Sequence, residues 1–207
     1  MLGDRDGRAL LMRKQSGVNL IELMVAISIL GLLLALAMPN FSRMVQDAQN
    51  RTAAESVLNG LQLARAEALR RSTQVRFTLT DKEGKVAWTV GCVNANICSA
   101  SIQERGPDEG GNNARVGVTT VALPKPLKPD TFASILSAGA GLDKPAVVTF
   151  DSFGRASAPA GTEISRIDVT NAKTSEARRY VVTVGAGGQV RMCDPDTRLG
   201  GTPQGCT

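Results

Sequence analysis

The chain has 207 residues, of which 43% are hydrophobic, 21% are charged and only 3% are aromatic, and its formal net charge is +5. It contains no histidine, which excludes nucleophile pairs of the Ser–His and Cys–His types. The scarcity of aromatic side chains leaves Val, Ile, Leu and Ala to build the hydrophobic core. The weak positive charge permits contact with nucleic acid without arguing for it.

The most apolar stretch of the chain runs from residue 20 to residue 38 and contains a single charged residue, Glu22. As a helix it would be roughly 30 Å long, which is enough to cross the hydrocarbon core of a bilayer. The basic residues that precede it are Arg5, Arg8, Arg13 and Lys14. Because basic flanks stay on the cytoplasmic side, we expect the rest of the chain on the far side of the membrane.

Two simpler interpretations of this stretch are a plain signal anchor, with Glu22 at headgroup depth, and a secretory signal peptide. The signal peptide is disfavoured because the apolar run is longer than the usual signal core and no A-x-A site follows it. An ionised carboxylate in an apolar membrane helix costs about 2.5 kcal/mol or more, so Glu22 needs a reason to be there.

Gly17, Glu22 and Pro39 lie around the apolar run in an order that resembles the class III leader of type IV pilins and pseudopilins. In that family a prepilin peptidase cuts after the glycine and methylates the new N-terminus. The resemblance therefore implies a leader of residues 1–17, cleavage between Gly17 and Val18, and methylation of Val18. One departure is Val18 itself, because phenylalanine is the commonest residue there.

The same resemblance implies an assembly role for Glu22, which is the fifth residue after the expected cut. Its carboxylate would pair with the amine of Val18 on a neighbouring subunit. Such a pair in apolar surroundings fixes the register of the subunits more than it adds net stability, because desolvation offsets most of the attraction. Pro39 falls where the family commonly has a helix-kinking proline.

One long helix is predicted from residue 18 to residue 71, with a transmembrane half at 18–38. Beyond Pro39 the apolar residues recur at helical spacing and form one stripe. Gly60 should weaken this helix by about 1 kcal/mol relative to alanine. We expect the stripe to pack on a sheet, while the first half is buried in the membrane and then among neighbouring subunits.

After residue 71 the apolar pattern changes to the period of two that is typical of strands. Residues 72–207 are therefore predicted to form one β-rich globular domain, and the fold class is α+β, with the long helix packed on an antiparallel sheet. The predicted strands are 74–80, 85–91, 115–123, 131–136, 146–150, 163–170, 178–184 and 188–193. Residues 92–114 are rich in Gly, Asn and Ser, and we expect them to form a loop.

The cysteines are Cys92, Cys98, Cys193 and Cys206, and all lie beyond the apolar stretch. An even number on the exported side indicates two disulfides, which can pair in three ways. We favour Cys92–Cys98 and Cys193–Cys206, because each pair closes a short polar loop. A zinc site is the alternative, but the chain has no CxxC pair and no histidine. We expect no metal ion and no cofactor.

A long helix followed by antiparallel strands and a glycine-rich final hairpin is similar to the GspH/FimT group of minor pseudopilins and minor pilins. The C-terminal residues that carry this resemblance are Gly187, Gly188, Arg191, Cys193, Asp194 and Pro195. In that group the globular part packs two β-sheets against the helix, in subunits at or near the filament tip.

This narrower resemblance implies a subunit without enzymatic activity that helps to initiate and assemble a type IV pilus or a type II secretion pseudopilus. Its partners would be prepilin peptidase, other minor subunits and the major subunit. Before assembly it would sit in the inner membrane as a single-pass protein, with a cytoplasmic N-terminus and a periplasmic domain.

Some FimT-type pilins bind DNA during natural transformation, through basic residues near the C-terminus. The candidate positions here are Arg178, Arg179, Arg191 and Arg198, but the GRxR-like motif attributed to those relatives is absent. Phosphate contacts need several positive charges on one face, and aromatic stacking residues are scarce. The sequence therefore favours ordinary surface arginines over DNA contact. The alternative to a filament subunit is a bitopic periplasmic protein that binds a ligand or DNA.

Overall fold

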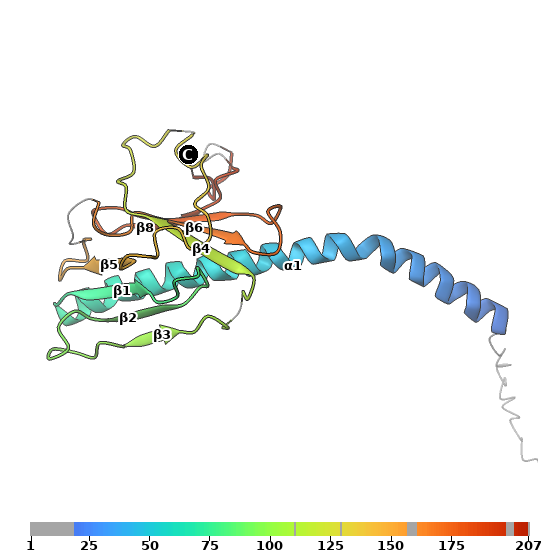
Figure 1. Cartoon of the computed structure of the whole chain (residues 1–207), viewed down its shortest axis with the longest axis horizontal. Coiled ribbons are helices and arrows are strands. Elements are labelled where there is room, and N and C mark those ends of the chain that lie inside the picture. Colours follow the sequence, from blue (N-terminus) through green and yellow to red (C-terminus); the bar gives the residue numbers. More distant parts are fainter. Residues whose placement is uncertain (1–18, 110, 129, 157–160, 198–200, 207) are drawn as a thin grey trace, which may run out of the picture. The chain divides into compact units, whose positions relative to one another are not determined.

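The computed structural model describes residues 19–109, 111–128, 130–156, 161–197 and 201–206, without the side chains of residues 36–40. The chain divides into two units, Met1–Asn40 and Phe41–Thr207, and one helix, α1 (Leu20–Arg71), runs through both (Figure 1). The strands that follow are β1 (Val75–Leu79), β2 (Trp88–Cys92), β3 (Gln103–Arg105), β4 (Ala114–Thr119), β5 (Val147–Phe150), β6 (Arg166–Asn171), β7 (Tyr180–Val184) and β8 (Val190–Cys193).

Helix α1 ends at Arg71, as the sequence predicts, because the next residue leaves the helical conformation. Ser72 adopts a left-handed backbone with φ of 50°. The N–H groups of Ser72 and Thr73 then bond back to the carbonyl oxygens of Leu69 and Ala68, at 3.3 and 3.2 Å. These bonds satisfy carbonyls that the end of a helix leaves without partners.

Residues 36–40 are helical, but their side chains lie outside the described ones, so the kink at Pro39 stays a prediction. The predicted transmembrane half, 18–38, extends at both ends beyond the described side chains. Among the described residues, no helix is both long enough and apolar enough to cross a membrane.

The strands form two four-stranded antiparallel sheets, with the orders β3-β2-β1-β5 and β4-β6-β7-β8. Strands β1 and β2 make the predicted hairpin, with Phe77 opposite Val90. Strands β7 and β8 make the glycine-rich hairpin, with Val182 opposite Met192. The α+β class is therefore confirmed, and the antiparallel strands are divided between two sheets.

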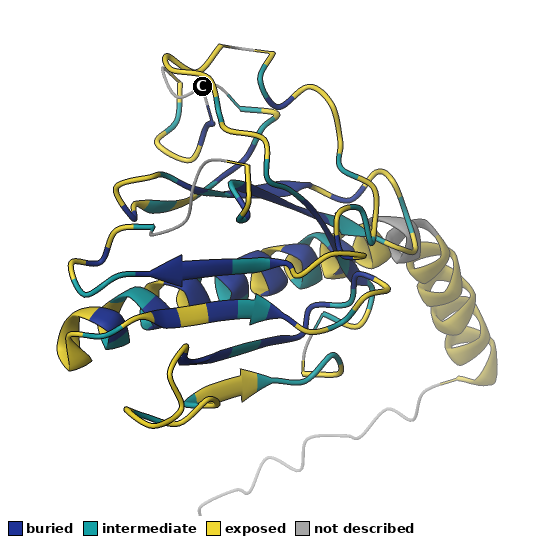
Figure 2. Ribbon diagram, turned by 60° about the vertical axis from the view of Figure 1, so that its left-hand side comes forward, coloured by how far each residue is buried: buried dark blue, intermediate teal, exposed yellow. Residues whose placement is uncertain are grey.

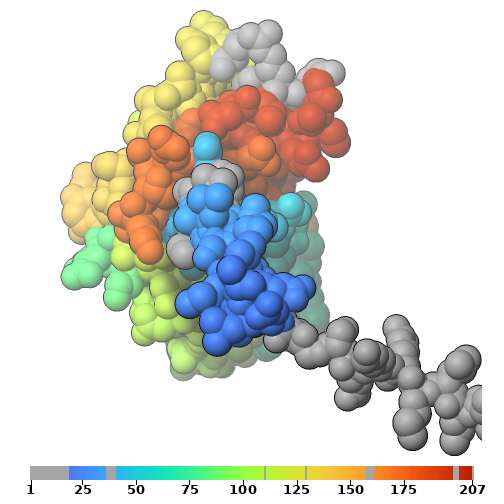
Figure 3. All heavy atoms as spheres, turned by 90° about the vertical axis from the view of Figure 1, so that its right-hand side faces the viewer, coloured from blue at the N-terminus to red at the C-terminus, as the bar shows by residue number. Residues whose placement is uncertain are grey.

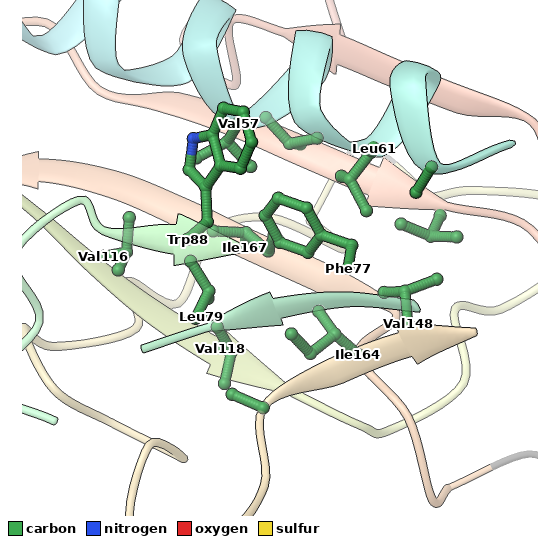
Figure 4. Close-up of a cluster of buried hydrophobic side chains, with 14 of the residues drawn as sticks. Val57, Leu61, Phe77, Leu79, Trp88, Val116, Val118, Val148, Ile164 and Ile167 are labelled. Atoms are coloured by element: carbon green, nitrogen blue, oxygen red, sulfur yellow. The ribbon is translucent and has the colours of Figure 1, made fainter. Parts of the chain in front are cut away.

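Both sheets pack against one face of the second half of α1, which Figure 2 shows as a dark blue stripe. The fully buried apolar residues of this stripe are Ala53, Ala54, Val57, Leu61, Ala64 and Ala68. In Figure 4, Val57 and Leu61 on α1 lie beside Phe77 and Trp88 of the first sheet. Because most of the stripe is alanine, the strands supply most of the large side chains of the core.

Gly60 has a packing reason that the helix pattern did not reveal. A Cβ atom at this position would lie 2.8 Å from Cε2 of Phe77 and 3.1 Å from Cε2 of Trp88. The two rings pack on each other with centroids 5.8 Å apart. Glycine therefore costs some helix propensity but makes room for the largest side chains of the core.

One predicted strand and one predicted loop are wrong. Residues 131–136 form no strand, because the apolar Phe132 is buried in a small cluster with Val181 and the Cys193–Cys206 pair instead of in a ladder. Conversely, strand β3 lies inside the predicted loop 92–114. Its residues are polar and largely exposed at a sheet edge, so they lack the alternation that marks a half-buried strand.

A buried ionic cluster holds residues 131–136 on the second sheet. Asp168 is completely buried and accepts bonds from Arg166 at 2.6 and 2.7 Å and from Arg179 at 2.9 Å. It also accepts the N–H of Leu136 at 3.1 Å. The two guanidinium groups donate in turn to the carbonyl oxygens of Thr131, Phe132 and Ser134. The cluster thus supplies the partners that a strand ladder would have given this segment.

Gly188, in the β7–β8 hairpin, makes the closest backbone approach to the turn that follows β5. Its φ is 77°, and a Cβ atom there would lie only 1.8 Å from the carbonyl oxygen of Gly154. That same oxygen accepts a bond of 3.0 Å from Nε of Arg65 on α1. Gly188 therefore allows α1 and a turn of each sheet to meet at one point.

We expect Asp168→Ala to lower the free energy of unfolding by about 3–5 kcal/mol, because it leaves two buried guanidinium groups without their carboxylate. Glu176→Ala is the matched control, since Glu176 is exposed and its nearest cation, Arg43, is 3.8 Å away; it should cost less than about 1 kcal/mol. Urea unfolding of the detergent-solubilised chain measures both values. Equal losses in the two variants would contradict the role of the cluster.

We expect Gly188→Ala to cost more than about 2 kcal/mol, because strain at positive φ adds to the clash with Gly154. The neighbouring substitution Gly187→Ala is the control. Its added Cβ would meet only the flexible side chain of Gln189, and its φ is not in the left-handed region. If thermal unfolding showed the same midpoint for both variants, the close approach would not matter to stability.

Candidate functional site

The first half of α1 exposes an apolar surface on all its sides. Every large apolar side chain from Leu20 to Leu34 is between 51% and 71% exposed. Figure 2 shows this part of the helix in yellow. Burying one such side chain contributes roughly 1.5–3 kcal/mol. A continuous apolar surface of this kind marks a segment that packs against lipid or other protein chains.

The described part of this helix begins with a capping pattern that the sequence analysis did not include. Asn19 precedes the first helical residue, and its carbonyl oxygen accepts the N–H of Leu23 at 3.1 Å. Glu22 is the acidic residue of the first turn. Asparagine at the N-cap with glutamate three residues later is a common helix start, and a carboxylate there complements the helix dipole. Glu22 therefore stabilises the start of α1, independently of the assembly role expected for it.

The expected cleavage site lies outside the described residues. Gly17, Val18 and the leader 1–17 belong to the part of the chain whose placement is not described. The first described residue, Asn19, directly follows Val18. A cut after Gly17 would thus place the new amine on Val18, two residues before Leu20, the start of α1.

The four cysteines form the disulfides Cys92–Cys98 and Cys193–Cys206, with Cα–Cα distances of 5.6 and 4.9 Å. These are the pairs that the sequence analysis favours. The second bond fixes the C-terminal tail beside β8, where the N–H of Asp194 donates to the carbonyl oxygen of Gln204 at 2.7 Å. Within the described ranges, no three residues of the His, Cys, Asp and Glu types are close enough to hold a metal ion.

The arginines considered for DNA contact differ in their surroundings. Arg179 is 9% exposed and belongs to the Asp168 cluster, so its charge is already used inside the domain. Arg178 is exposed and lies 3.4 Å from Asp194. Arg191 donates to the carbonyl oxygen of Gly205 at 2.7 Å, and Arg198 lies outside the described residues.

The described arginines of this group therefore do not share one open cationic face. In Figure 3 the red C-terminal residues lie next to the orange segment around residues 170–180. Arg178 ties these two segments together through Asp194, and Arg191 ties β8 to the C-terminal tail. Phosphate binding would need several uncommitted positive charges side by side.

Polar side chains of α1 hold the loop between β6 and β7 against the helix. Asn50 is fully buried, donates to the carbonyl oxygen of Arg178 at 2.9 Å and accepts from Asn171 at 3.1 Å. Asp47 accepts the N–H of Arg178 at 2.7 Å. These bonds orient the loop between β6 and β7 on the helix, and they are structural contacts rather than a reactive site.

Comparisons with known proteins point to one family. The model of the family described as type II transport protein GspH matches residues 53–188, and the model of the prokaryotic N-terminal methylation motif matches residues 12–38. No relative was found among curated proteins.

Two solved structures are similar in fold. Both are crystal structures of the type IV minor pilin FimU of Pseudomonas aeruginosa strain PAO1, in two crystal forms. Their sequence identities are 14% and 15%, and their TM-scores are 0.44 and 0.42. The matches cover 71% of this chain in both cases, and 90% and 94% of the FimU chains.

Proposed function

The chain belongs to the family of type II transport protein GspH, and on that premise we propose that it is a minor pilin or pseudopilin that helps to initiate and assemble a filament. Its family and fold are those of structural pilin subunits rather than of enzymes. Its partners are other pilin-like subunits, including the major subunit, in a type IV pilus or a type II secretion pseudopilus.

The exposed apolar half of α1 is the single observation that carries this proposal. It coincides with the N-terminal methylation motif of residues 12–38, and its large side chains are more than half exposed from Leu20 to Leu34. A helix that is apolar on all sides is stable only when lipid or other helices surround it. Insertion in the inner membrane, followed by packing against the same segment of other subunits, provides both surroundings in turn.

Processing would begin at the leader, residues 1–17, which stays in the cytoplasm because of its basic residues. Prepilin peptidase cuts after Gly17, and the amine of Val18 is methylated. The globular unit lies in the periplasm, an oxidising compartment that suits its two disulfides. Pro39 would bend the helix between the apolar half and the globular unit.

Glu22 would act after processing, when the new amine of Val18 carries a positive charge. That charge sits at the N-terminal end of α1, where the helix dipole is also positive. A carboxylate nearby relieves this repulsion. When the carboxylate belongs to a neighbouring subunit, the pair also fixes how far one helix is shifted along the next. The pair then specifies register more than stability.

The first test is the intact mass and N-terminal sequence of the membrane-purified chain, from cells with and without prepilin peptidase. We expect a chain that starts at methylated Val18 only when the peptidase is present, and one that starts at Met1 without it. A chain that starts at Met1 in both strains would overturn the proposal. Residues 18–38 would then be the plain anchor of a bitopic periplasmic protein.

The role of Glu22 is tested with the pair Glu22→Ala and Glu22→Gln. Glutamine preserves the capping pattern at the start of α1 but removes the charge. We expect both variants to be cleaved normally and to reduce filament assembly by at least about tenfold, because an unpaired amine among apolar helices costs more than the 1.4 kcal/mol that this factor represents. Electron microscopy and immunoblots of sheared filaments measure assembly.

Normal assembly by the Glu22→Gln variant, together with failure of Glu22→Ala, would show that capping and not charge is what Glu22 supplies. Normal assembly by both variants would remove Glu22 from the mechanism altogether. In either case the cleavage of the leader would be unaffected, so the proposed identity as a filament subunit would stand on the mass measurement alone.

A further inference from the structure

The C-terminal end of α1 and the turn after β5 each expose one large apolar side chain. Phe153, in the turn after β5, is 72% exposed, and Leu69 on α1 is 48% exposed. The turn packs on this leucine, because a Cβ atom on Gly154, the residue after Phe153, would lie 3.2 Å from Cδ1 of Leu69. Figure 1 shows the end of β5 at the same end of the globular unit as the end of α1.

The turn that presents Phe153 is held from several sides. Oδ1 of Asp151 accepts the N–H groups of Phe153 and Arg155, both at 2.9 Å. The carbonyl oxygen of Gly154 accepts Nε of Arg65, and Gly188 packs directly on the same group. A side chain on a fixed turn loses little conformational entropy when a partner covers it. The backbone that carries Phe153 is therefore preorganised for contact with a partner.

In the ion pairs around these two apolar side chains, the positively charged groups are the ones exposed to solvent. The side chains of Arg70 and Arg155 are 63% and 62% exposed, while their carboxylate partners Glu67 and Asp151 are only 14% and 18% exposed. Bonds from Arg70 and Arg71 hold the pKa of Glu67 below its usual value, and the backbone N–H of Arg155 does the same for Asp151. Both carboxylates are therefore ionised at neutral pH, beneath an outer layer of guanidinium groups.

This arrangement favours an acidic protein surface over nucleic acid as the partner. The guanidinium groups of Arg70, Arg71 and Arg155 outnumber the carboxylates of Glu67 and Asp151, so the surface keeps a positive excess that acidic side chains can neutralise. A phosphate backbone could also use this charge, but it would leave the exposed leucine and phenylalanine uncovered. An exposed aromatic side chain beside arginines is typical of the residues that contribute most of the binding energy in protein–protein contacts. Arg155 also lies over the ring of Phe153, with its Cζ atom 5.1 Å from the ring centroid.

A second copy of this chain is a poor partner in a symmetric contact. If two copies met through this surface, the exposed charges on both sides would be the guanidinium groups of Arg70 and Arg155, and like charges brought together are destabilising. A different chain that brings carboxylates avoids this repulsion. The surface is therefore suited to a heterologous contact.

We propose that Leu69, Phe153, Arg70 and Arg155 form a docking surface for the globular domain of a different pilin-like subunit, which offers an apolar pocket bordered by carboxylates. The choice of a pilin-like subunit rests on the proposed function. In a filament held together by the first half of α1, the opposite end of this helix is free to meet the domain of the next subunit. Phe153 fills the pocket, and the two arginines pair with its rim.

The test is photo-crosslinking of the full-length chain in cells that make all the filament subunits. A photoreactive phenylalanine analogue replaces Phe153 in one strain and Val121 in the control strain, because Val121 is 71% exposed and lies in the loop after β4. Mass spectrometry identifies the crosslinked peptides. We expect position 153 to give at least fivefold more product than position 121. The partner peptide should come from another chain with an N-terminal methylation motif, and it should contain Asp or Glu.

A second measurement tests the side chain itself. Phe153→Ala should reduce the amount of that subunit recovered with the chain at least fivefold, whereas Val121→Ala should leave it unchanged. Both substitutions shorten exposed side chains, so neither should impair folding. Unchanged recovery with Phe153→Ala would overturn the proposal. So would equal crosslinking at the two positions, or products that contain only this chain or nucleic acid.

Failure of this inference is distinguishable from failure of the proposed function. The same samples report the N-terminus of the chain by mass. A chain that starts at Val18 and enters filaments, but does not crosslink at position 153, rejects the docking surface alone. A chain that keeps its leader rejects the filament role, whatever the crosslinks show.

Discussion

The close contact between the alanine-rich face of α1 and the two sheets is the constraint on which the globular unit depends. This face carries mostly small side chains, so the strands supply most of the large ones, and Gly60 leaves room for Phe77 and Trp88. Without this face, each sheet would expose its apolar inner side to water, because a sheet needs a second layer to cover it. The polar contacts of Asn50 and Asp47 fix the orientation of the same helix at its other end.

The second sheet is also stabilised by a buried ionic cluster. Asp168 gathers Arg166 and Arg179, and through them it holds the carbonyl oxygens of residues 131–136. A buried carboxylate with two guanidinium partners is costly to desolvate. The cluster nevertheless fixes the path of residues 131–136, which have no strand partner. Arg179 is therefore a structural residue of the domain, which is why its charge does not contribute to an external cationic face.

Helix α1 also explains how one chain can serve two environments. Its second half is amphipathic and belongs to the globular unit, while its first half is apolar on all sides and large side chains there are exposed. The first kind of surface is completed within the chain, and the second only by lipid or by other subunits. In a family of filament subunits this division separates folding from assembly. The surface around Phe153 then provides a contact that does not involve the apolar segment, through which one particular neighbour could be selected.

The sequence by itself determined the long helix, the α+β class, both hairpins and the family, because these depend on local periodicity and on short motifs. It also indicated the two disulfide pairs, since each joins cysteines that are close in the chain. Only the tertiary structure decided that residues 131–136 dock through Asp168 instead of forming a strand, and that β3 extends the first sheet. It likewise explained why glycine stands at positions 60 and 188, and it placed the turn that carries Phe153 against Leu69. These features depend on contacts between residues far apart in the chain, which leave no periodic signal in the sequence.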